Sequence, residues 1–572
     1  MKRSLSLFCS LFLLLGLQIV LPAQNVTKLR KNMESVLVDA VQLYDSGNYK
    51  DARARLSVIV DSDPSNDAAY YYLGLCDYYL GNVKDAEVEL REAMKLDPKN
   101  YWYRDRLAVL YSMTGQEELT INMYESLLED YPKKTDIYYN LVNLYAHQGR
   151  MEKVIETLDN IETIVGKDET TTIARYDVLM HMGRNEDAFK VLEAFNEEYS
   201  SPQILSLMGD VKINEYNDSL ALKYYDEALA LDSELPSAII GKSEVYRIRR
   251  SYDEYFDILS GFTSSPSIPV QMKSQYLTTL VQHLDGRFVQ NFRPQLDSLF
   301  ESGIKAHPAD SSMLLAAGTY YFRSERQPRA VQLFKRNSEL FPDNFNAVAM
   351  YVQSLSYGDD WDTLAEESEK AFSAFPQEAA FLNMRLMAFY NKNDYESVIK
   401  ESERMVSLFP KDTTVALQAY SSIGDCHHLL GNEKLAFQAY EKALKINPAY
   451  APVLNNYAYY LSLKGKKLKK AYAMSKITVE QEPDNATYLD TFAWILHLQG
   501  KSLEAKSFFK HAMLYGGKES VTMLDHYAEV LYALKEYDLA GVYWNMAKQK
   551  NADNEVPDLE ERIEVRMKAV KK

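Results

Sequence analysis

The chain has 572 residues, and its 64 Lys and Arg against 81 Asp and Glu give a net charge of −17. Its 22 Gly, 18 Pro and 3 Cys are too few for a collagen-like chain, a β protein with many turns or a disulfide scaffold. Hydrophobic residues make up 47%, which excludes wholesale disorder, and the acidic balance argues against a general nucleic-acid binder, because phosphate contacts need clustered Lys and Arg.

Residues 1–23 have the pattern of a secretory signal peptide. Lys2 and Arg3 precede an apolar run that ends at Val20, and the small residue Ala23 follows shortly afterwards. We expect cleavage after Ala23 and an exported chain that is periplasmic or envelope-associated. The alternative is an uncleaved membrane anchor, although the run is short for the roughly 20 apolar residues that a spanning helix needs. No later segment is long and apolar enough to cross a membrane.

Prolines recur along the chain at a spacing of 34 residues. The first series comprises Pro64, Pro98 and Pro132. A second series with the same spacing comprises Pro308, Pro342, Pro376 and Pro410. A fixed period of this length indicates an array of repeats, each of which is one supersecondary unit.

The period that begins at Asp67 shows what one repeat contains. It reads as two amphipathic helices that are joined at Gly81 and end before Pro98. Gly74 and Ala86 are small, so they let the two helices approach closely. Large residues fill the space beside this contact, and they are Tyr70, Leu73 and Leu90. Each period therefore predicts a helix-turn-helix pair.

The same pattern of small and large residues recurs before Ser233, Pro448 and Gly517. It resembles the tetratricopeptide repeat (TPR) family from Met33 to about Ala552. The resemblance implies an all-α fold, a right-handed α-solenoid of about 15 helix-turn-helix TPR-like repeats.

The period is lost between residues 261 and 309, where a turn-rich insertion runs from Ser264 to Pro269. We therefore predict an N-terminal TPR array over 24–260, an irregular joint over 261–309 and a C-terminal TPR array over 310–556. The tail 557–572 is predicted to be a capping helix, because a stack of repeats needs a polar-faced end for solubility.

The TPR resemblance also implies which side chains line a concave groove that binds protein or peptide partners. In the N-terminal array they are Tyr71, Tyr78, Trp102, Asp105, Tyr139 and Asn143. In the C-terminal array they are Asn455, Tyr459, Asp490, Trp494, His497, Asp525, Glu529 and Tyr532. The tryptophans would anchor a partner, and the acidic residues would favour a basic segment. The alternative is that these aromatic rings pack against the helix of the next repeat.

Patterns that carry catalytic or metal chemistry are missing from the sequence. His427 and His428 adjoin Asp425 and Cys426, but consecutive helical residues point about 100° apart, so they do not form a chelating pair. Cys426 and Cys76 fall on packed positions of distant repeats, and we expect no disulfide between them. We predict no enzymatic activity, no cofactor and no metal site.

Residues 454–513 are similar to repeats of bacterial envelope TPR proteins. That resemblance implies a non-enzymatic scaffold or adaptor in the cell envelope that binds partner segments in its groove. The alternative is a periplasmic chaperone-like protein that binds exported polypeptides. The sequence predicts protein or peptide partners, no nucleic acid and no membrane span in the mature chain.

Overall fold

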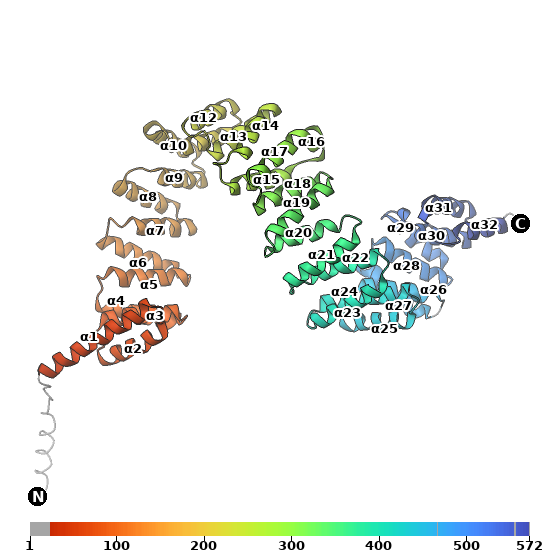
Figure 1. Cartoon of the computed structure of the whole chain (residues 1–572), viewed down its shortest axis with the longest axis horizontal. Coiled ribbons are helices and arrows are strands. Elements are labelled where there is room, and N and C mark those ends of the chain that lie inside the picture. Colours follow the sequence, from red (N-terminus) through yellow and green to blue (C-terminus); the bar gives the residue numbers. More distant parts are fainter. Residues whose placement is uncertain (1–22, 466, 554–555, 571–572) are drawn as a thin grey trace, which may run out of the picture. The chain divides into compact units, whose positions relative to one another are not determined.

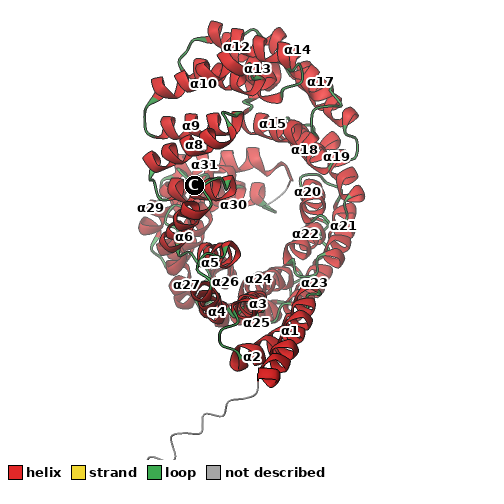
Figure 2. Cartoon of the chain, turned by 90° about the vertical axis from the view of Figure 1, so that its left-hand side faces the viewer, coloured by secondary structure: helices red, strands yellow, loops and turns green. Residues whose placement is uncertain are grey.

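The computed structural model describes residues 23–465, 467–553 and 556–570, and every regular element in these ranges is a helix (Figure 2). The predicted all-α fold of paired helices is therefore confirmed. The chain divides into two compact units, Met1–Tyr255 and Phe256–Lys572, which we call unit 1 and unit 2 and describe separately. The predicted signal segment lies outside the described residues apart from Ala23, where the first helix begins.

Unit 1 consists of consecutive helices that pack against one another in chain order (Figure 1). They are α1 (Ala23–Asp45), α2 (Tyr49–Ser62), α3 (Asp67–Tyr79), α4 (Val83–Leu96), α5 (Tyr101–Met113), α6 (Glu117–Asp130), α7 (Thr135–His147), α8 (Met151–Val165), α9 (Glu169–His181), α10 (Asn185–Tyr199), α11 (Pro202–Asn214), α12 (Asp218–Leu231) and α13 (Pro236–Arg249). The next helix, α14 (Tyr252–Ser264), contains the boundary between the units.

Local signals set the limits of each pair. At the start of α3 the Asn66 side chain accepts a hydrogen bond from the Ala69 backbone N–H at 2.9 Å, which satisfies one of the free donors of the first turn. The turn between α3 and α4 needs Gly81, whose φ of +83° is strained for other residues. Pro98 lies between α4 and α5, where it interrupts no helix.

Close approach within a pair depends on small residues that face large rings. A Cβ atom at Gly209 on α11 would lie 2.5 Å from the ring of Tyr225 on α12. The same ring also covers Gly241 on α13, the first helix of the next pair. The Tyr225 hydroxyl donates to the Asp210 carboxylate at 2.5 Å, so this buried ring also has its polar end satisfied.

Unit 2 begins with three helices of the predicted joint and continues with regular pairs. The helices are α15 (Val270–His283), α16 (Gly286–Asn291), α17 (Arg293–Ala306), α18 (Ser311–Arg323), α19 (Gln327–Leu340), α20 (Phe345–Leu355), α21 (Trp361–Ala374), α22 (Ala379–Asn391), α23 (Tyr395–Leu408), α24 (Thr413–Leu429), α25 (Glu433–Ile446), α26 (Ala451–Leu463), α27 (Leu468–Gln481), α28 (Ala486–Leu498), α29 (Ser502–Ala512), α30 (Val521–Ala533), α31 (Tyr537–Lys550) and α32 (Leu559–Val570).

The last helix packs on the final pair. Leu559 and Ile563 of α32 are buried in the same apolar cluster as Tyr527 and Trp544 of α30 and α31. Trp544 is 1% exposed, as expected for the packed position that the repeat pattern gives it. Among the described helices, none has the length and apolar composition that crossing a membrane requires.

Candidate partner-binding sites

A cavity of about 330 Å³ opens between the first helices of unit 1, and tyrosine rings form much of its wall. We call it the tyrosine cavity. Its lining residues are Tyr44, Asp45, Tyr71, Tyr72, Leu75, Tyr78, Tyr79, Leu90, Arg106, Val109 and Leu110. The structure thus brings two predicted groove residues, Tyr71 and Tyr78, into one cavity.

The rings of the tyrosine cavity support one another. Tyr44 meets Tyr72 edge to face with ring centroids 5.5 Å apart, and Tyr71 meets Tyr72 in the same way at 5.3 Å. The Tyr78 hydroxyl donates to the Met113 sulfur at 2.9 Å. Such contacts hold the rings in place without filling the cavity, so the wall is rigid and aromatic.

The cavity also contains charge of both signs. The Arg106 Nε lies 3.8 Å from Asp105, and burial raises the pKa of this carboxyl group although Arg106 opposes the shift. Burial also raises the pKa of Tyr71, again against the effect of Arg106. Asp45 is exposed at the cavity wall and has no hydrogen-bond or ion-pair partner in the described part of the chain.

The other predicted groove residues of unit 1 lie on α5 and α7. Trp102 is 57% exposed, and its ring meets only the edge of Tyr101, at 5.3 Å, among the aromatic rings of the described residues. Tyr139 is half-buried and Asn143 is exposed. Trp102 therefore presents a large apolar surface to solvent beside the tyrosine-rich helices.

The predicted groove residues of unit 2 are arranged differently, because they contact one another. The Trp494 ring stacks on His526 at 4.0 Å and on His497 at 5.3 Å, while Tyr459 approaches His526 at 6.2 Å. His526 Nδ1 lies 3.0 Å from Asp490 Oδ1. We call this group the C-terminal aromatic cluster.

Helix α32 supplies the counter-charges of this cluster. Asp525 accepts hydrogen bonds from the Trp544 indole N–H at 3.0 Å and from Arg562 at 2.7 Å. Arg566 lies 3.2 Å from Glu529 and stacks over the Tyr532 ring at 5.2 Å. The basic segment that meets these acidic residues is therefore the C-terminal helix of the same chain.

The sequence-based description of the C-terminal groove needs correction. Asn455, Asp490 and Asp525 are only 4%, 7% and 5% exposed, so they are not free groups on an open surface. The Trp494 ring packs on His526 of the following repeat, as the packing alternative has it, and Asp490 and Asp525 contact His526 and Arg562. Binding of a partner at the remaining exposed edges of Tyr459, His497 and Tyr532 stays a prediction.

Burial shifts the proton equilibria of the C-terminal aromatic cluster. It lowers the pKa of His497, and the neighbouring His526 and Arg566 add to this effect. Burial, followed by the charges of Asp490 and Asp525, raises the pKa of Tyr459 to about 12. The buried indole N–H of Trp494 finds no acceptor within the described residues, and an unmet buried donor costs free energy.

Three residues in or beside this cluster were missed from the sequence. His526 was not predicted because a single histidine on an apolar helix, next to Asp525, matches no binding or metal motif. Arg562 and Arg566 could have been found, because each lies 37 residues after its acidic partner, close to one repeat length.

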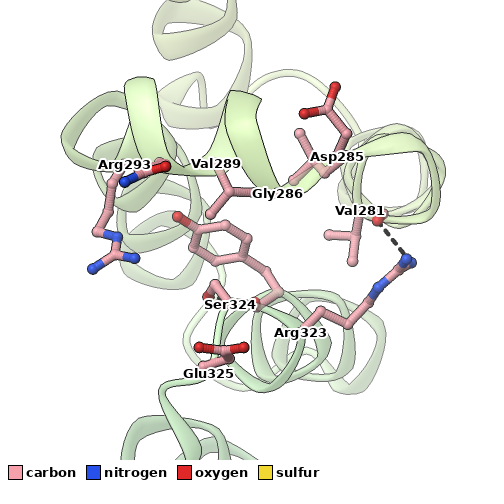
Figure 3. A pocket seen from close by; sticks show the side chains of 11 residues that line it. Val281, Asp285, Gly286, Val289, Arg293, Arg323, Ser324 and Glu325 are labelled. Atoms are coloured by element: carbon pink, nitrogen blue, oxygen red, sulfur yellow. Dashed lines mark hydrogen bonds between the residues drawn. The ribbon is translucent and has the colours of Figure 1, made fainter.

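A larger cavity, of about 480 Å³, lies where the repeat pattern is irregular in unit 2. The six-residue helix α16 stands beside α15 and α18 there, and the side chains of Arg293 and Arg323 lie at opposite sides of the cavity (Figure 3). Arg323 donates to the Val281 carbonyl at 2.9 Å. The predicted irregular segment gave no indication of this cavity.

The cysteines and histidines that the sequence analysis singled out lie in packed surroundings. Cys76 and Cys426 are buried free thiols, and burial raises the pKa of each thiol to about 12. His428 stacks on Tyr460 at 3.4 Å. Across the described ranges, no group of three or more His, Cys, Asp and Glu side chains could hold a metal ion.

Comparison with known families gives three matches, each to a model of the tetratricopeptide repeat. They cover residues 43–107, 105–134 and 417–450, and so fall in both units. The first two lie over the helices that form the tyrosine cavity and carry Trp102.

The chain is also similar to individual proteins over short stretches. TPR repeat-containing protein MJ1428 of Methanocaldococcus jannaschii is 25% identical over 183 residues, 27% of this chain and 32% of that protein. Cellulose synthase operon protein C of Pseudomonas fluorescens is 29% identical over 101 residues, 18% of this chain and 8% of that protein. The chain thus spans less than two thirds of either protein. The solved structure of Naa15/Naa10 bound to HypK-THB is 17% identical with a TM-score of 0.36, over 96% of this chain and 93% of that chain.

Proposed function

We propose that the chain, which is similar to tetratricopeptide repeat proteins, acts as a non-enzymatic scaffold or adaptor in the bacterial cell envelope. It binds protein partners at the first repeats of unit 1. There, helices α3 and α5 both line the tyrosine cavity, and α5 also carries the exposed Trp102. The single observation that supports this most is the tyrosine cavity, because its rings are held by one another and still leave a space of about 330 Å³.

Aromatic side chains suit this role for physical reasons. Tyr and Trp bury large areas at a small cost in conformational entropy, and they dominate the residues on which protein interfaces depend. Asp45 and Arg106 add charge of both signs at the cavity wall, so a partner segment with an apolar side chain flanked by polar groups would match it.

The test is crosslinking in living cells with a photoreactive phenylalanine analogue in place of Trp102. The matched control carries the same analogue in place of Tyr216, which is also an exposed aromatic residue of unit 1 and lies away from the cavity. We expect one or two envelope proteins to be recovered in proportion to the chain from the first site, and to be lost when Tyr78→Ala is added.

Two other outcomes would contradict this proposal. A long series of weakly bound exported polypeptides would favour the chaperone-like alternative. Equal recovery from Trp102 and Tyr216, unaffected by Tyr78→Ala, would show that the tyrosine cavity is not the binding site.

The envelope location is a separate part of the proposal and rests on the pattern of residues 1–23. We expect the mature protein to begin at Gln24 and to be recovered from the periplasmic or envelope fraction. Mass measurement of the intact mature chain checks the cleavage. A mature chain that still contains Lys2 and Arg3 would contradict cleavage and favour the anchor alternative.

A further inference from the structure

The last four regular pairs of unit 2, α24/α25 to α30/α31, share an edge formed by the turns between their two helices. The first helices α24, α26, α28 and α30 contact one another in series. Their equivalent places in successive repeats make them run in the same direction, so their C-terminal ends lie on the same side of the stack. We call this side the turn edge.

Each turn along the turn edge carries two leucines, although their places relative to the helix ends differ from turn to turn. In each of the four turns one leucine precedes the second helix and another follows five residues later. Six of these leucines are between 36% and 73% exposed, and they are Leu430, Leu435, Leu463, Leu498, Leu503 and Leu539. The pairs α18/α19 and α22/α23 lack this feature, since Ser324, Arg329, Lys392 and Ser397 occupy the corresponding places.

Such an apolar series is unusual on a protein surface. Single exposed leucines are common, but a continuing apolar edge normally marks a surface that another body covers. The leucines lie in or beside four separate turns, and Leu435 also lines a cavity of about 210 Å³ with Tyr420 and Ile423. A flat surface could therefore contact several of them at once, whereas a narrow peptide could not.

One turn of this edge, between α26 and α27, differs in charge from the whole chain. Residues 463–470 contain five lysines and no acidic residue, although the chain carries a net charge of −17. Lys467 and Lys469 are exposed, and neither side chain has an ion-pair or hydrogen-bond partner within the residues that the structure describes. Basic residues beside an exposed leucine such as Leu463 are a combination that binds anionic lipid headgroups.

We propose that the turn edge docks on an anionic lipid membrane surface. Its leucines enter the headgroup region, and its unpaired lysines lie against the lipid phosphates. The acidic remainder of the chain is repelled by the same surface, so the protein binds edge-on. This proposal is independent of partner binding at the tyrosine cavity.

The first experiment measures binding of the full chain to vesicles of phosphatidylglycerol and phosphatidylcholine at low salt. Lys467→Glu combined with Lys469→Glu should weaken binding at least about tenfold, because each lysine near an anionic surface contributes measurably. Leu463→Ser combined with Leu503→Ser should also weaken it. The matched control, Leu231→Ser with Leu340→Ser, changes two exposed leucines outside the turn edge and should bind like the parent.

A second, local measurement is needed because residues 1–23 could bind lipid by themselves. Leu503→Trp places a new indole on the turn edge, and Leu231→Trp places one elsewhere. With brominated lipids in the anionic vesicles, we expect additional fluorescence quenching for Leu503→Trp and none for Leu231→Trp, each relative to the parent.

Three results would overturn the proposal. They are equal vesicle binding by all variants, equal quenching at both new tryptophans, and capture of an acidic protein through the lysines without any quenching at Leu503→Trp. Circular dichroism of each variant confirms that a loss of binding is not a loss of folding.

Discussion

The predicted groove residues at the two ends of the chain differ in whether other side chains cover them. In unit 1 the first-helix positions leave Trp102 exposed and surround an open cavity with tyrosines. In unit 2 Trp494 stacks between His497 and His526, and α32 pairs with the acidic residues of the last repeat. A predicted place on the groove therefore does not decide whether a side chain is available, because side chains of later helices can cover it.

The largest expected difference between the two ends concerns these two tryptophans. Trp494→Ala should lower the free energy of unfolding of unit 2 by about 3 kcal/mol, since it removes a stacked and largely buried ring. Trp102→Ala should change that of unit 1 by less than about 0.5 kcal/mol, because the side chain is exposed. Urea unfolding of both variants checks this. Equal losses would show that the two positions are not different in packing.

A second prediction concerns the core, where we expect the two units to agree. Ala436→Leu in unit 2 and Ala221→Leu in unit 1 each insert a large side chain at a fully buried helix contact. Each should cost about 1–3 kcal/mol through overpacking. Thermal unfolding provides the measurement. No shift in either variant would mean that the small residue at this position of the repeat is not a packing requirement.

A third prediction isolates the contribution of α32. Arg562→Met removes the partner of the buried Asp525, and we expect a loss of about 1–2 kcal/mol, reduced by the partial exposure of Arg562. The matched control is Lys568→Met, whose exposed pair with Glu564 should contribute less than about 0.5 kcal/mol. If the control costs as much as Arg562→Met, the ion pair with Asp525 is not what holds the helix.

We also expect a pH dependence of opposite sign at the two ends. Burial and the neighbouring Asp77 carboxylate raise the pKa of Glu89 in unit 1 to about 8. The folded form therefore binds the proton more tightly than the unfolded form, so this contribution is full below the ordinary glutamate range and is lost as pH rises through about 8. In unit 2 the lowered pKa of His497 acts in the other direction, and stability is lost as the pH falls below the ordinary histidine range.

Amide hydrogen exchange at several pH values measures the protection of helices at both ends of the chain in one sample. Raising the pH should reduce protection in α3 and α4 and increase it in α28 and α30. Glu89→Gln should abolish the first trend and His497→Asn the second. A trend of the same sign at both ends, unchanged by these substitutions, would contradict the assignment.

The fold could be predicted because its signals lie within single repeats. The proline spacing, the small residues that face large ones and the core positions of Trp544, Cys76 and Cys426 all depend on one helix pair. The groove could be predicted only in part. The burial of Asp490 and Asp525 depends on His526, Arg562 and other side chains that come a full repeat later. The cavity beside α16 arises where the period fails, so no repeat pattern could indicate it.

The ring of Tyr225 contacts glycines of two successive pairs, and this has a mechanical consequence. In most of a repeat stack, a force applied to the chain ends can peel off one pair at a time, because each interface is local. The Tyr225 ring packs on both Gly209 and Gly241, so one side chain holds α11, α12 and α13 together. Under an applied force, α11, α12 and α13 should unfold together in a single, longer step. Unfolding that begins at a neighbouring pair on either side should slow when it reaches these three helices.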